Sequence, residues 1–163
     1  MKRLLVLAGF MISLPSFSQE LYVFTEPASN MPAHSMSLKL TSHLYTHVNS
    51  FGRLAQRYYP QAMLGLNKKI MLHLGVTFSN VHTSAFRYES ASLYLKYRFL
   101  SNDDIHEHFR MAAFLDASIT SAPFQFDEIG LMGDKSGIEG GLIATQLLNR
   151  LALSATLSHT QVI

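Results

Sequence analysis

The chain has 163 residues and no cysteine, which excludes disulfide bonds as a source of stability. Only 15% of the residues are charged while 48% are hydrophobic, a composition that argues against disorder. The formal net charge of +2 is cancelled if Lys2 and Arg3 are removed with the N-terminal segment, and a near-neutral mature chain gives no electrostatic reason to expect a nucleic-acid partner. Past the N-terminus no segment resembles a transmembrane helix. Stability must therefore come from packing, from a closed network of strand hydrogen bonds, or from a lipid bilayer.

The first residues have the pattern of a secretory signal. Lys2 and Arg3 precede an apolar run, Leu4–Leu14, and a short segment with small residues ends at Ser18. The apolar run is too short to span a membrane. We therefore expect residues 1–18 to be a cleaved signal peptide and the mature chain to be exported.

Residues 19–34 interrupt the strand pattern, because Pro27 and Pro32 oppose regular ladder formation. This lead segment could plug the mouth of a barrel or make a periplasmic contact. A plain linker is the favoured interpretation, since prolines and small residues suit linkers.

The clearest pattern runs from Gln61 to Asn80, where two alternating segments flank a turn at Asn67–Lys69. This predicts a β-hairpin. In the second arm the apolar residues are Ile70, Leu72, Leu74, Val76 and Phe78, and the residues between them are Met71, His73, Gly75, Thr77 and Ser79. Such alternation gives a strand with one apolar face. It lasts roughly ten residues, longer than an ordinary strand of about five or six, which suits a tilted membrane crossing.

The same unit repeats along residues 35–163, the predicted barrel domain. Seven strands are expected, beginning near Ser35, Gln56, Ile70, Ala91, Phe109, Gly137 and Leu151. Pro60 should lie at an edge or a bulge. Longer loops are predicted at Val81–Ser90 and Ser121–Ser136, and shorter turns at Ser101–His108 and Asn149–Arg150. Alternation of short and long connections is typical of outer-membrane barrels.

The predicted fold class is all-β, an antiparallel up-and-down transmembrane β-barrel. A soluble lipocalin-like barrel would use the same strands but hide the apolar face inside. Strand length, turn pattern and aromatic residues near the strand ends favour the membrane form; these aromatics are Tyr58, Phe78, Tyr97, Phe99 and Phe109.

Bacterial single-chain barrels have an even number of strands, at least eight, whereas seven are predicted here. We therefore expect an open, incomplete sheet whose first and last strands do not meet, and a barrel domain that is incomplete at its C-terminus. A closed ring would contradict this expectation.

The chain resembles the outer-membrane β-barrel proteins of Gram-negative bacteria. The segments Thr25–Pro32, Ser92–Phe99 and Gly141–Gln146 are similar to a group of uncharacterised barrel proteins proposed to be channels or transporters. The resemblance covers most of the mature chain and implies fold and location, with no catalytic residues to carry over. The chain departs from such barrels in lacking a terminal aromatic residue, since it ends at Ile163.

The expected function is that of a passive pore or transporter for small solutes, in contact with outer-membrane lipid. The candidate lumen-lining residues are Lys39, His43, Tyr94, Lys96, Arg98, Arg110, Asp116 and Glu139. The charged members from Lys96 to Glu139 could form a mixed-charge ladder, either as structural pairs between neighbouring strands or as a selectivity filter. The alternatives to a pore are a structural or binding barrel with a filled lumen and the soluble lipocalin-like barrel.

No enzyme chemistry, metal site or cofactor is expected. His43 and His47 lie roughly 13 Å apart along an extended strand, too far to share an ion. His106 and His108 suit a solvated turn better than a metal site. No nucleophile elbow is present.

Overall fold

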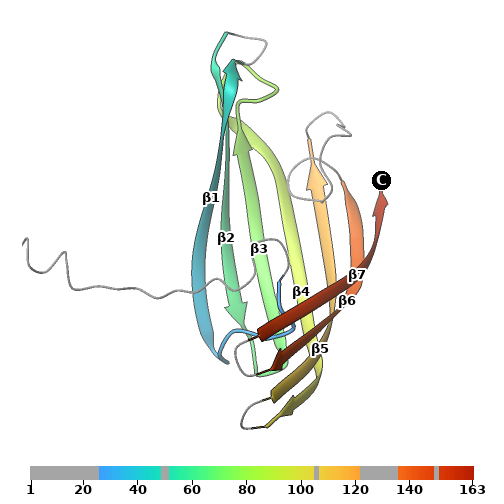
Figure 1. Cartoon of the computed structure of the whole chain (residues 1–163). Coiled ribbons are helices and arrows are strands. Elements are labelled where there is room, and N and C mark those ends of the chain that lie inside the picture. Colours follow the sequence, from blue (N-terminus) through green and yellow to red (C-terminus); the bar gives the residue numbers. More distant parts are fainter. Residues whose placement is uncertain (1–25, 49–51, 105–106, 122–135, 149–150) are drawn as a thin grey trace, which may run out of the picture.

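The computed structural model describes residues 26–48, 52–104, 107–121, 136–148 and 151–163. These residues form a single antiparallel sheet in which each strand pairs with the next (Figure 1). The strands are β1 (Ser35–Val48), β2 (Leu54–Gly65), β3 (Ile70–Ser79), β4 (Arg87–Asp103), β5 (Glu107–Thr120), β6 (Gly137–Leu148) and β7 (Leu151–Val162). The described part of the chain has no helix long and apolar enough to cross a membrane.

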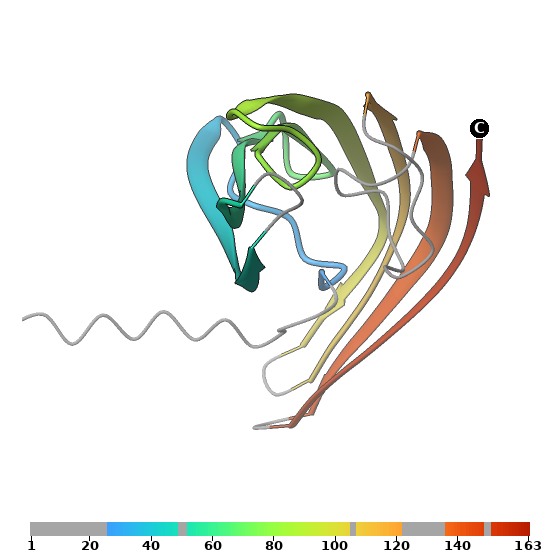
Figure 2. The same ribbon diagram turned by 90° about the horizontal axis from the view of Figure 1, so that it is seen from above.

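The sheet curls but does not close (Figure 2). Its strand order runs from β1 to β7, and these two outer strands are not paired with each other. The all-β prediction and the expectation of an open sheet of seven strands are thus confirmed. The predicted signal peptide at 1–18, residues 19–25 and the turn at Asn149–Arg150 lie outside the described residues.

Cross-strand pairing assigns each side chain to one of the two faces. One row of directly opposed residues crosses all seven strands and consists of Ser37, Met63, His73, Tyr94, Asp116, Glu139 and Thr160. Directly opposed residues share a face. We call this the concave face, because residues 26–34 lie on its side, within the curve of the sheet (Figure 2).

The two faces differ in polarity: apolar side chains are exposed on one, and polar side chains are buried on the other. The convex face carries exposed apolar residues such as Leu38 at 74%, Leu74 at 45% and Leu157 at 77% relative exposure. The concave face buries polar side chains, including His73 and Lys96. The facing predicted from the alternation in β3 is correct, and it is the reverse of a lipocalin-like arrangement.

Exposed aromatic residues lie towards both ends of the convex face. Phe78 and Tyr88 are opposed near one end, and Tyr97 is opposed to Ile70 near the other. Phe78 and Ile70, the partners of Tyr88 and Tyr97, are eight steps of about 3.3 Å apart along β3, about 26 Å in all. At a tilt of 35–45° this spans about 19–22 Å, slightly less than the apolar band of about 25 Å in an outer-membrane barrel.

The connections alternate as predicted, although two of them are shorter than expected. Residues 66–69, 104–106 and 149–150 join strands at one end, and residues 49–53, 80–86 and 121–136 join them at the other. The predicted turn Ser101–His108 is wrong at both ends, because β4 continues to Asp103 and β5 starts at Glu107. A register shift between Arg98 and Leu100 changes the direction of this part of β4. An Arg110–Asp103 ion pair of 2.8 Å joins β4 to β5.

The predicted loop Val81–Ser90 is also too long, since β4 begins at Arg87. The expectation that Pro60 lies at an edge or a bulge is wrong. It lies inside β2, between β1 and β3, opposite Leu40. Pairing between β2 and β3 is interrupted at Tyr59 and Pro60 without a change of register, which accommodates the missing N–H of proline.

Candidate functional site

The described part of the lead segment, residues 26–34, is held on the concave face chiefly by Lys96. The Lys96 ammonium donates to Glu26 Oε2 at 2.9 Å, to the Pro27 carbonyl at 2.9 Å and to the Ser29 carbonyl at 3.0 Å. An ammonium has three donors, so all of them are used. The Lys96 side chain is only 1% exposed, and its charge is compensated by Glu26.

A second set of contacts holds the segment over β5 and β6. The Ala28 N–H donates to Thr145 Oγ1 at 2.9 Å, and the Ala28 side chain packs in a small apolar cluster with Ala112 and Ile143. Arg110 Nη1 donates to Ser29 Oγ at 2.8 Å. Polar and apolar contacts therefore fix the same short stretch of chain.

The end of the segment is fastened where it enters β1. The His34 N–H donates to the Gly65 carbonyl at 2.6 Å, and His34 has a positive φ of 59°. A Cβ at Gly65 would overlap the Pro32 carbonyl, so this close approach of two backbones requires glycine. The interpretation as a plain linker is wrong for residues 26–34, because they are bound along their length to the sheet.

All eight candidate lumen residues fall on the concave face by their register, but the structure does not bring them into one cluster. Lys96 and Arg110 bind the lead segment. Arg98 donates instead to the Lys68 carbonyl at 2.7 Å. Lys39 and His43 lie exposed on β1. That these residues line a pore stays a prediction.

The expected mixed-charge ladder is wrong. Asp116 and Glu139 are directly opposed on β5 and β6, so two acids face each other instead of an acid and a base. The cations that were expected to pair with them have other partners: Glu26 for Lys96 and Asp103 for Arg110. The predicted ladder does not form, because the lead segment supplies the carboxylate that binds Lys96 and the extended end of β4 supplies the one that binds Arg110.

Aromatic rings line the concave face beside Lys96. Tyr94 lies between His73, at a ring distance of 4.9 Å, and Phe114, at 5.5 Å. On β2, Tyr59 reaches across Gly75 to hydrogen-bond Ser92 at 2.7 Å. A Cβ at Gly75 would overlap the Tyr59 ring, so glycine makes room for this aromatic bridge between strands.

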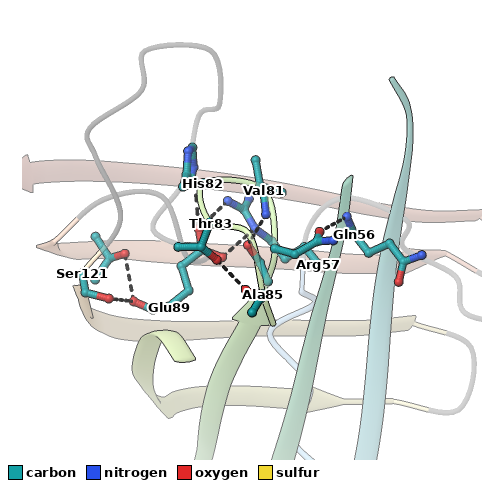
Figure 3. A network of polar contacts seen from close by, with 11 residues as sticks. Gln56, Arg57, Val81, His82, Thr83, Ala85, Glu89 and Ser121 are labelled. Carbon is teal, nitrogen blue, oxygen red and sulfur yellow. Dashed lines mark hydrogen bonds and ion pairs between the residues drawn. The ribbon is translucent and has the colours of Figure 1, made fainter. Parts of the chain in front are cut away.

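A separate polar cluster lies near the long-loop end of the sheet (Figure 3). Arg57 on β2 forms a bidentate ion pair with Glu89 on β4, with hydrogen bonds of 2.8 and 3.1 Å, and both side chains are buried. Glu89 reaches the concave face through a bulge, since Thr77 opposes Ser90 while Phe78 opposes Tyr88. The bulge could not be recognised from the sequence, and Glu89 was missed because it fell in a predicted loop.

The backbone of Glu89 also ties β4 to the end of β5. Its carbonyl accepts from the Ser121 N–H at 2.8 Å and from Thr120 Oγ1 at 3.2 Å. A cavity of about 270 Å³ adjoins the cluster and is lined in part by His82, Arg87 and Glu89. Because Arg57 already neutralises Glu89, this cluster is best explained as a structural link between three strands.

Within the described residues, no three His, Asp or Glu side chains converge to hold a metal ion. Comparison with family models, with curated proteins and with solved structures finds no match.

Proposed function

We propose that the chain forms an outer-membrane β-barrel wall and acts as a passive pore or transporter for small solutes. The single observation that carries the proposal is the inverted polarity of the sheet: apolar side chains are exposed on the convex face and polar side chains are buried on the concave face. In water this distribution is unfavourable, because burying apolar area is the main driving force of folding. In a bilayer it is the expected one.

The aromatic bands and the alternation of short and long connections support the same orientation. The short connections would face the periplasm and the long ones the exterior. The concave face would then be the lumen, with the lead segment lying inside it and narrowing it.

A second candidate, a structural barrel with a filled interior, is favoured by one specific observation. Lys96 and Ala28 are almost fully buried in the contact between the lead segment and the sheet, so this part of the interior is packed. The two candidates differ in whether the lead segment can leave the lumen.

Conductance in a planar bilayer separates them. The pore proposal predicts discrete channels from the full chain, with a higher open fraction for Lys96→Met, which loses the main anchor of the segment. Lys69→Met is the matched control, since Lys69 lies in the turn between β2 and β3, and it should behave as the wild type. A folded, inserted Lys96→Met protein with no conductance would support the filled barrel instead.

A further inference from the structure

The carboxylate of Glu26 occupies a site built by two inward-facing side chains. Its Oε2 accepts a hydrogen bond from Lys96 Nζ at 2.9 Å, and its Oε1 lies 3.6 Å from His73 Nε2. The Lys96 side chain is 1% exposed and that of His73 is 4% exposed. Both belong to the sheet, on β4 and β3, whereas the carboxylate is brought by the lead segment.

His73 is held in position independently of Glu26. Its Nδ1 lies 3.5 Å from Gln61 Nε2, and its ring packs on Tyr94. Its Nε2 is buried and has no hydrogen-bond partner among the described residues, because the distance to Glu26 is too long. A buried ring nitrogen without a partner calls for an explanation, and here it is directed at the position of a carboxylate.

We propose that Lys96 and His73 form a binding site for the carboxylate of a small anionic solute, and that Glu26 fills this site as an internal substitute while the lead segment is docked. The inference rests on the proposed function in one respect, namely that solutes reach the concave face. When residues 26–34 leave the sheet, the Lys96 ammonium loses all three acceptors and the solute carboxylate replaces them.

The surroundings set which anion fits. Asp116 lies in the same cross-strand row as His73, two strands away, at about 10 Å. Glu139 stands directly opposite Asp116 and adds a second negative charge. A second carboxylate pointing along this row would be repelled, so the site should prefer monocarboxylates to dicarboxylates.

Competition with Glu26 gives the proposal its sharpest test. The tethered carboxylate acts at an effective concentration of about the millimolar range or higher. Removing its charge by Glu26→Gln should therefore tighten the apparent binding of added acetate about tenfold. Lys96→Met should weaken it about tenfold or more, the effect of losing one charge-assisted hydrogen bond.

Binding would be followed by NMR of the full chain in detergent micelles, through the imidazole signals of His73, assigned with a His73→Gln variant. Acetate should shift these signals saturably, the neutral isostere acetamide should not, and succinate should bind more weakly than acetate. Lys69→Met keeps the fold and the site and should match the wild type.

Equal shifts with acetate and acetamide, unchanged affinity in Lys96→Met, or no gain in Glu26→Gln would each overturn the proposal. Failure of the pore is distinguishable, because micelle binding does not require conduction. Saturable acetate binding without channels would refute the pore alone, and channels without acetate binding would refute only this site.

Discussion

Replacing Lys96 by methionine should release residues 26–34 from the sheet while leaving the sheet folded. Methionine has a similar length and keeps the apolar contacts of the lysine stem, but it removes the ammonium that donates to Glu26, Pro27 and Ser29. Breaking a fully buried ion pair costs about 3–5 kcal/mol. Glu26 is 35% exposed and regains water on release, so the loss here should be smaller, about 2–3 kcal/mol.

The Ala28 amide reports this loss directly. It donates to Thr145 Oγ1 at 2.9 Å, and the Ala28 side chain is fully buried, so its exchange with solvent requires the segment to open. Since 1.4 kcal/mol corresponds to a factor of ten, Lys96→Met should speed hydrogen exchange at Ala28 about 30- to 140-fold. Amides within the β3–β4 ladder should keep their protection, and Lys69→Met should change neither set.

Unchanged exchange at Ala28 in a folded Lys96→Met protein would refute this reasoning. The segment would then be held by its apolar contacts with Ala112 and Ile143, and the ion pair would contribute nothing to docking.

Two further predictions concern the sheet itself. Arg57→Met should lower the free energy of unfolding by about 3–5 kcal/mol, because it leaves the buried Glu89 carboxylate without its cation. In urea titrations of vesicle-refolded protein, the double variant with Glu89→Gln should recover at least half of this loss. Strictly additive losses would contradict the pairing. Gly75→Ala should lower the free energy of unfolding by about 2 kcal/mol or more, because its Cβ would overlap the Tyr59 ring. Gly140→Ala, whose Cβ would meet no atom closer than 3.7 Å, should change the free energy of unfolding by less than about 0.5 kcal/mol in the same titration. Equal effects would show that Tyr59 does not cross Gly75.

The sheet was largely predictable because a period of two residues fixes both the strands and their faces. The alternation in β3 alone placed Leu74 on the convex face and His73 on the concave one, as the structure has them. Strand ends were less predictable. Bulges at Glu89 and near Phe99 depend on which residue opposes which, and this is not encoded in the composition of either strand.

The site was predictable only in part. Lys96 and Arg110 were recognised as inward-facing charges from their positions in alternating strands. Their partners were not, because Glu26 and Asp103 lie in stretches that resembled a linker and a turn. Docking of the lead segment depends on contacts between residues about 70 positions apart, such as Lys96 and Glu26, and no local sequence pattern indicates such contacts.

The central claim is that the convex face contacts lipid, and the absence of tryptophan from the chain makes it directly measurable. Single tryptophans would be placed at two adjacent exposed positions of β7 that face opposite ways, Leu157→Trp on the convex face and Thr156→Trp on the concave one. In vesicles containing lipids brominated on the acyl chain, the account predicts blue-shifted, strongly quenched emission from Leu157→Trp and little quenching of Thr156→Trp. Equal quenching at both positions, or recovery of either variant as a water-soluble protein that ignores the vesicles, would contradict it.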